Sequence, residues 1–463
     1  MPGRETEPLV TLPLQGDYND EYTTPVSESD MEATTPAKLI SRKEPQSNIS
    51  LWDDTDVRQK LLLMDLMLMD FLTLFSSSIP SPFFSRIVIK RGGSILYSAL
   101  ILQSLMLSFS ICCVIIGKYL PSMGIKKMFV GGLATFGLCQ VIFGLLHFVM
   151  DIKAFTGLGI LIRVLQGAGE AAFAISSMSV ICEEYPAHIT KVFGFTEAMV
   201  GVGYLMGPIF GGGMFDTLGM LLPLVLSGGI VILSIPCHFF LLRPYTHEET
   251  AESGEFNVLD WLSNPYIISV LCSVATVFGT FGYIDVAITT YLEKLGFTVT
   301  TVGLVLFTVG LSYCIAAALI GYIVSFKVWV RKVSMTVGFI GFSLVLMVYV
   351  PKQLTFLIYV GSSALGIFGA LGTVPAFEDL LPSDSDPSLE IHSAISGAWY
   401  GCIGLGMFVL PLIGSAIHKV LHSFSWALFV LSCIGFAITL ILAGLVYFIK
   451  RVKSSSHLND LVD

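Results

Sequence analysis

The feature that most constrains the fold of this chain is a series of long apolar stretches, which begins near residue 59 and continues almost to the end. About 20 consecutive apolar residues are enough for a helix to cross the hydrocarbon core of a bilayer. Inside a bilayer the backbone must satisfy its own hydrogen bonds, which favours helices over other structures. The sequence therefore predicts an all-α, polytopic membrane protein with twelve transmembrane helices.

The apolar stretches fall into two sets of six, separated by a polar segment rich in glutamate. We expect the first six spans near 59–84, 95–119, 127–148, 154–182, 190–214 and 219–243. The second six are expected near 265–292, 299–325, 332–350, 353–380, 392–417 and 424–449. This arrangement predicts an N-terminal six-helix bundle over 59–243 and a C-terminal six-helix bundle over 264–450, joined by a cytosolic linker over 244–263.

Composition excludes several classes of protein. Charged residues make up 13% of the chain, whereas soluble domains contain about 25%. This low content excludes a soluble enzyme and a single-pass receptor with a folded ectodomain. The net charge of −9 arises largely in the polar ends of the chain and does not indicate a nucleic-acid-binding surface.

Both ends of the chain are polar, and we expect residues 1–58 to be a disordered N-terminal tail and 451–463 a C-terminal tail. Lysine and arginine are more frequent on the side of the membrane that holds these tails, which predicts that both termini are cytosolic. The segment Glu5-Thr6-Glu7-Pro8-Leu9-Val10 resembles an acidic dileucine-type sorting signal. We therefore expect an intracellular vesicle or endolysosomal membrane, with the plasma membrane as the alternative.

Glycine and proline positions reveal an internal repeat. The fifth predicted span contains Gly194, Gly203, Pro208 and Gly211, and adding 203 to each number gives Gly397, Gly406, Pro411 and Gly414 in the eleventh. Glycine and proline are common in membrane helices, but four matches at one offset indicate duplicated halves. Repeated halves are typical of transporters.

Two motifs in the first half resemble those of a known superfamily. The first is the string Gly194, Gly203, Gly207, Pro208, Gly211 and Gly212. It resembles the antiporter motif of the twelve-span drug:proton antiporters of the major facilitator superfamily. The second is Arg163-Val164-Leu165-Gln166-Gly167, which resembles the arginine motif of the same superfamily. The resemblance implies a proton-coupling role for Arg163, and Glu170 lies two helical turns away on the same face.

A third family motif is degraded here, in the stretch from Gly117 to Lys127 between the second and third spans. The glycines and the basic end remain, but Pro121-Ser122 stands where the family has an acid and a base. The cytosolic gate contact that this motif supplies in the family is therefore in doubt. Around 117–130, 197–212, 282–294 and 376–380 the chain is similar to the vesicular polyamine transporter branch of the vesicular amine transporter family, and the resemblance covers most of residues 60–450.

Acidic residues inside the predicted spans are the candidates for substrate binding. Charges in the bilayer core are costly and usually functional. Asp70 lies about ten residues into the first span, or ~15 Å deep at 1.5 Å per residue. We assign substrate binding to Asp70, Glu197, Asp285 and Glu378, and expect Asp65, Asp379 and Glu293 to cap helices or pair internally. Several acids with one embedded arginine predict a central, anionic cavity suited to cations.

Aromatic rings in the spans could bind an amine through cation–π contacts. The candidates include Tyr204, Tyr313 and Trp399, but we favour Tyr283 and Tyr400. Histidines such as His238 are expected to pack rather than to bind a ligand.

Catalysis, metals and cofactors are not indicated. The nine cysteines lie in apolar runs without CxxC spacing, which gives no zinc or disulfide pattern. We find no nucleophile–base string, phosphate-binding loop or metal cluster, so we expect a protein that is not an enzyme and needs no cofactor. The expected partners are a small cationic substrate, protons and membrane lipid, with no nucleic acid and one copy of the chain.

Taken with the resemblance, these features predict a major facilitator fold that works by alternating access. The expected function is proton-coupled antiport of an organic cation, with a polyamine as the first choice. A drug or monoamine antiporter of the same superfamily is the alternative. A transport-silent membrane sensor or scaffold is the second alternative, suggested by the degraded loop at Pro121-Ser122.

Overall fold

The computed structural model describes residues 51–243, 258–294, 299–324, 328–348, 355–381, 389–421 and 423–459. Within these ranges all regular structure is helical. Twelve helices are long and apolar enough to cross a membrane, which confirms the predicted all-α, twelve-span architecture. The protein is therefore a multi-pass membrane protein.

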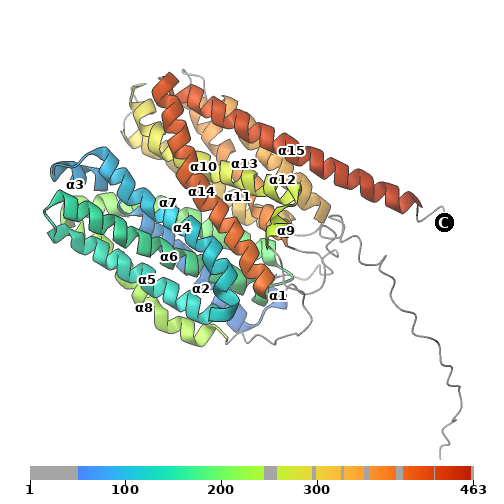
Figure 1. Cartoon of the computed structure of the whole chain (residues 1–463), viewed down its shortest axis with the longest axis horizontal. Coiled ribbons are helices and arrows are strands. Elements are labelled where there is room, and N and C mark those ends of the chain that lie inside the picture. The colour runs from blue at the N-terminus through green and yellow to red at the C-terminus, as the bar shows by residue number, and fades with distance from the viewer. Residues whose placement is uncertain are drawn as a thin grey trace, which may run out of the picture.

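The spanning helices form two groups that lie side by side, coloured blue to green and yellow to red in Figure 1. The first half contains α2 (Val57–Ser78), α4 (Ile95–Met123), α5 (Ile125–Leu145), α6 (Ile152–Glu184), α7 (Ile189–Leu218) and α8 (Leu221–Leu241). The second half contains α10 (Pro265–Lys294), α11 (Val299–Val324), α12 (Val328–Val348), α13 (Thr355–Leu380), α14 (Leu389–Leu421) and α15 (Phe424–Asn459).

The first span is shorter than predicted. The apolar run suggested a helix to residue 84, but α2 ends at Ser78 and a separate short helix, α3 (Phe84–Lys90), follows. Pro80 and Pro82 lie between them. Proline has no N–H to donate and disfavours helical geometry in the residue before it, which explains the break.

The ends of the chain also differ from expectation. Residues 51–58, predicted as part of the tail, contain α1 (Leu51–Asp54) and the start of α2, and Leu51 is buried. At the other end α15 continues to Asn459 and projects beyond the bundle in Figure 1. The linker contains α9 (Val258–Leu262), and a short 3-10 helix, η3 (Leu146–Phe148), follows α5. Residues 1–50, with the proposed sorting signal, and residues 244–257 and 460–463 lie outside the described residues.

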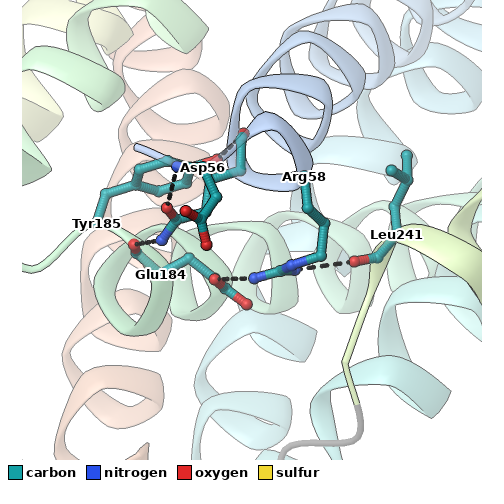
Figure 2. A network of polar contacts seen from close by, with 6 residues as sticks. Asp56, Arg58, Glu184, Tyr185 and Leu241 are labelled. Atoms are coloured by element: carbon teal, nitrogen blue, oxygen red, sulfur yellow. Dashed lines mark hydrogen bonds and ion pairs between the residues drawn. The ribbon is translucent and has the colours of Figure 1, made fainter. Parts of the chain in front are cut away.

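At the predicted cytosolic end, a network of polar contacts joins the start of α2 to the ends of α6 and α8 (Figure 2). Arg58 pairs with the Glu184 carboxylate at the end of α6 and donates to the Leu241 carbonyl at the end of α8, at 3.0 Å. The Tyr185 hydroxyl donates to the carbonyl of Gln59. Burial, followed by the neighbouring Glu184 charge, raises the pKa of Tyr185, so this hydroxyl keeps its proton. The start of α2 and the ends of α6 and α8 therefore meet at this network.

Glycines bring α7 into backbone contact with α2. A Cβ on Gly203 would overlap the Phe71 carbonyl oxygen, and one on Gly207 would lie 2.5 Å from the Phe75 carbonyl oxygen. In the second half a Cβ on Gly406 would overlap the carbonyl oxygen of Ala275 in the same way. Since Gly203 and Gly406 are related by the offset of 203, the repeat seen in the sequence is a repeat of helix packing.

The two halves also meet through paired glycines. A Cβ on Gly117 of α4 would lie 2.9 Å from the Cα of Gly397 in α14, and one on Gly194 of α7 would lie 3.0 Å from the Cα of Gly321 in α11. Gly194 corresponds to Gly397 by the offset of 203, and Gly117 corresponds to Gly321 by an offset of 204. If each glycine is replaced by its counterpart in the other half, the contact Gly117–Gly397 becomes the contact Gly321–Gly194. The two halves are therefore related by an approximate two-fold axis.

The packing of α7 on α2 generates a stability prediction. Glycine to alanine normally stabilises a helix by about 1 kcal/mol. Gly203→Ala should instead lower the unfolding temperature in detergent, because the added methyl overlaps a backbone oxygen that cannot move away. Gly213→Ala is the matched control, since a Cβ there meets nothing within 4 Å. Equal melting of the two variants would contradict the packing.

Candidate functional site

Two acids from different helices of the first half lie near each other at its inner side. Asp70 comes from the middle of α2 and Glu197 from α7, the helices that the glycines hold in contact. Glu197 is within Coulombic range of Asp70. Among the residues that the structure describes, neither carboxylate has a basic side chain as a partner. When the two carboxylates are ionised, their negative charge has no basic counterpart among the described residues in this part of the membrane-spanning region.

Side chains of the second half complete this position. The Tyr313 hydroxyl of α11 donates to Glu197 Oε2 at 3.1 Å and lies 3.2 Å from Thr373 Oγ1 of α13. Tyr400 of α14 is within Coulombic range of both carboxylates. The acids of one half thus face hydroxyl groups of the other. A ligand held here would contact both halves at once.

A third acid lies further toward the predicted lumenal end. Asp285 of α10 accepts a hydrogen bond from the hydroxyl of Tyr204 in α7, another contact between the halves. Tyr204 follows Glu197 by seven residues, so it lies on the same face of α7 about 10 Å along the axis. Tyr204 is 37% exposed. Asp285 therefore provides a separate acidic point at a different depth from Glu197.

An aromatic cluster lies on the other side of Glu197, toward the predicted cytosolic end. Phe193 of α7 is 5.6 Å from Phe377 of α13 and 6.1 Å from Trp399 of α14, measured between ring centroids. Phe377 and Trp399 are 5.5 Å apart. All three rings are buried. Since they come from both halves, they close the space between the halves on this side of the acids.

The arginine motif lies in the core of the first half rather than between the halves. Arg163 is 1% exposed, and its guanidinium carbon lies 4.1 Å from the centroid of the Phe143 ring. It donates to Gln166, which donates in turn to Gln140 of α5 at 2.8 Å. Glu170 is within Coulombic range of Arg163 but forms no ion pair with it. The proton-coupling role of Arg163 and Glu170 stays a prediction.

Two residues assigned to the site from sequence are engaged elsewhere. Glu378 pairs with Arg331 at the predicted cytosolic end of the second half, because an acid late in α13 reaches the start of α12. Tyr283 is fully buried and stacks on Phe424 at 5.7 Å. Neither joins Asp70 and Glu197, whereas Asp285 and Tyr400 do face the region between the halves.

The sequence analysis named Tyr204 and Tyr313 as aromatic candidates without favouring them, and the structure shows that their hydroxyls donate to Asp285 and Glu197. The spacing of seven residues from Glu197 to Tyr204 is a signal that both share a face of α7. No local spacing predicts the contact of Tyr313 with Glu197, because that contact depends on how the halves meet.

The acids expected to pair internally do so where the structure describes them. Asp65 Oδ2 lies 2.8 Å from His238 Nδ1, and Asp379 Oδ2 lies 2.7 Å from Lys332 Nζ. His238 is fully buried against Phe129, which confirms a packing role. The side chain of Glu293 lies outside the described residues.

Comparisons with known proteins agree with the twelve-helix fold. The model of the Major Facilitator Superfamily matches residues 66–389 and 270–461. The Homo sapiens protein named MFS-type transporter SLC18B1 is 25% identical over 362 residues, which cover 76% of this chain and 78% of that protein. Its Mus musculus counterpart of the same name is 26% identical over 365 residues with the same coverage. Multidrug resistance protein 2 of Bacillus subtilis (strain 168) is 26% identical over 232 residues, or 47% of this chain and 54% of that protein.

The contact between Tyr313 and Glu197 can be tested by stability. Tyr313→Phe removes the hydroxyl that donates to this buried acid, so we expect the free energy of unfolding to fall by about 1–3 kcal/mol. The measurement is thermal or denaturant unfolding of purified protein. Tyr447→Phe, at a tyrosine that is 66% exposed, is the control and should melt like the wild type. A Tyr313→Phe variant as stable as the wild type would show that the hydrogen bond contributes nothing.

Proposed function

This chain belongs to the major facilitator superfamily, and from that premise we propose that it exchanges protons for an organic cation, preferably a polyamine, across a vesicle membrane. It is a membrane transporter related to MFS-type transporter SLC18B1. The proposed cycle is alternating access, in which the two halves rock about the site between them. In this proposal both termini are cytosolic and the membrane is that of an intracellular vesicle or endolysosome.

The observation that carries the proposal is the pair Asp70 and Glu197 without a basic partner among the described residues. Two negative charges that share a low-dielectric site disfavour each other unless a cation is present. Either a proton or an ammonium group can supply that positive charge. Competition between the two for one pair of carboxylates is the physical basis of exchange.

The preference for a polyamine rests on Asp285. This acid lies near Tyr204, about 10 Å along α7 from Glu197. A linear polyamine carries several ammonium groups separated by short methylene chains, so it can engage acids at both depths. A monoamine can engage one of them. The ring of Tyr400 supports the same ligand class, because tyrosine faces attract ammonium groups.

The related alternative is a drug or monoamine antiporter. The similarity to Multidrug resistance protein 2 favours it, although that similarity covers 47% of this chain. The pair Asp70 and Glu197 suits any organic cation. Whether Asp285 also contributes to binding therefore distinguishes a polyamine transporter from a drug or monoamine antiporter. A transport-silent sensor, the second alternative, has no support in the described contacts beyond the degraded loop motif.

The proposal is tested by flux. Protein reconstituted in liposomes with an acidic interior should accumulate labelled spermidine, and a protonophore should abolish the uptake. Glu197→Gln and Asp70→Asn should each lower uptake at least tenfold, because each removes half of the charge pair.

The matched control for these variants is Asp260→Asn, since Asp260 is exposed on α9 and distant in sequence from the site. It should transport like the wild type. Uptake that persists without a proton gradient would exclude antiport, and normal flux in both site variants would remove Asp70 and Glu197 from the site.

Asp285→Asn separates the two substrate classes. We expect it to weaken the apparent affinity for spermidine by about tenfold, which corresponds to ~1.4 kcal/mol. The affinity for a primary monoamine should change less than twofold, because a monoamine needs the Asp70–Glu197 pair alone. Competition against labelled substrate measures both constants in one preparation. Equal losses for the two ligands would contradict a second ammonium position at Asp285.

A further inference from the structure

Four basic residues lie at the predicted lumenal end of the first half, at or just outside the ends of its spans. They are Arg86 and Lys90 of α3, Arg91 directly after it, and Lys153 in the first turn of α6. Lysine and arginine normally concentrate on the cytosolic side of a membrane protein. Topology therefore does not explain this group, and the function proposed above uses none of the four.

One face of α3 packs against three helices of the first half. The ring centroid of Phe84, which is buried, lies 5.2 Å from that of Phe143 in α5 and 5.8 Å from that of Phe155 in α6. The hydroxyl oxygens of Ser85 in α3 and Ser98 in α4 are 2.9 Å apart. Figure 1 shows α3 at the end of the first half opposite to α1. This packing fixes which face of α3 is left exposed.

Arg91 joins α3 to the segments beside it. Its guanidinium donates to the carbonyl of Leu146 at 3.1 Å and to that of His147 at 2.8 Å, both in η3. The guanidinium carbon also lies 4.3 Å from the ring centroid of Phe155 in α6. Because these contacts hold α3 against η3 and the start of α6, the bases of α3 and Lys153 belong to one edge of the molecule.

The other three bases, Arg86, Lys90 and Lys153, form an exposed surface that we call the basic surface. None of them pairs with a carboxylate in the part of the chain that the structure describes. The neighbouring acid Asp151 caps α6, where it accepts the backbone N–H of Ala154 at 2.8 Å. Three bases beside one acid leave this edge with a net positive charge.

Apolar side chains are exposed beside the basic surface. Ile89 shares a face of α3 with the two bases of that helix, because the three positions have helical spacing. Phe148 ends the third candidate span, and Met150 lies just before the fourth. All three side chains are more than half exposed. Bases next to exposed apolar side chains at the end of a span are typical of a segment at the membrane–water interface.

We propose that the basic surface binds the headgroup of an anionic phospholipid in the lumenal leaflet. The three bases contact the phosphate, while Ile89 and Phe148 contact the acyl chains. An anionic headgroup leaves its phosphate charge uncompensated and attracts these bases, whereas a zwitterionic headgroup carries its own cation. The exposed apolar side chains favour a lipid over a soluble anion. This site is separate from the acids between the halves, and its test does not depend on transport.

Photo-crosslinking of the full chain in phosphatidylcholine nanodiscs tests the proposal. The probe is a trace of phosphatidylglycerol that carries a diazirine near its headgroup, and mass spectrometry locates the crosslinks. Residues 84–93 and 146–155 should carry at least fivefold more crosslinks with this probe than with phosphatidylcholine that carries the same diazirine. The triple variant Arg86→Gln, Lys90→Gln, Lys153→Gln should remove this excess, because it removes the positive charge and keeps the apolar side chains.

The matched control is the triple variant Lys118→Gln, Lys127→Gln, Arg243→Gln, which removes three exposed bases at the opposite end of the same half. It should keep the excess of crosslinks at 84–93 and 146–155. Equal crosslinking by the two probes in the wild type would overturn the proposal, and so would equal losses in the two triple variants. Millimolar inorganic phosphate, compared with chloride at the same ionic strength, should not compete with the probe. Competition by phosphate would assign the surface to a soluble anion and reject the lipid.

Discussion

The structure depends on how a membrane protein compensates negative charge away from water. Carboxylates in this environment need a proton, a base or a cation, because desolvation is otherwise too costly. Asp65 has His238, Asp379 has Lys332 and Glu378 has Arg331. Asp70 and Glu197 have no such base among the described residues. This contrast sorts acids that hold the bundle together from acids that are available to a ligand.

Close helix packing puts the available acids where they can act. Because glycines let α7 lie against the backbone of α2, Glu197 and Asp70 come within Coulombic range. The same type of contact, at Gly194 with Gly321 and at its repeat counterpart, joins the halves. Backbone contact leaves no room for intervening side chains at these points. The site therefore lies between helices whose backbone contacts follow the two-fold relation of the halves.

Most of the fold could be predicted, and part of the site could not. The twelve spans and the repeat follow from hydropathy and glycine spacing, while the end of the first span was wrong because Pro80 and Pro82 lie within an apolar run. Glu378 was assigned to the site because it is an embedded acid, and Tyr283 because its ring could bind an amine. Polarity at a given depth does not reveal the direction in which a side chain points, and both residues are held by other partners.

The sequence by itself determined the number of membrane helices, the duplication of the halves and the small set of embedded charges. These are properties of single segments, set by apolar length and by the cost of burying a charge. Only the tertiary structure decided which charges are paired, because the partners are far apart in the chain. Glu197 and Tyr313 are separated by 116 positions, and Glu183 and His392 by 209. Such contacts depend on how two packed halves meet, and no local pattern encodes that meeting.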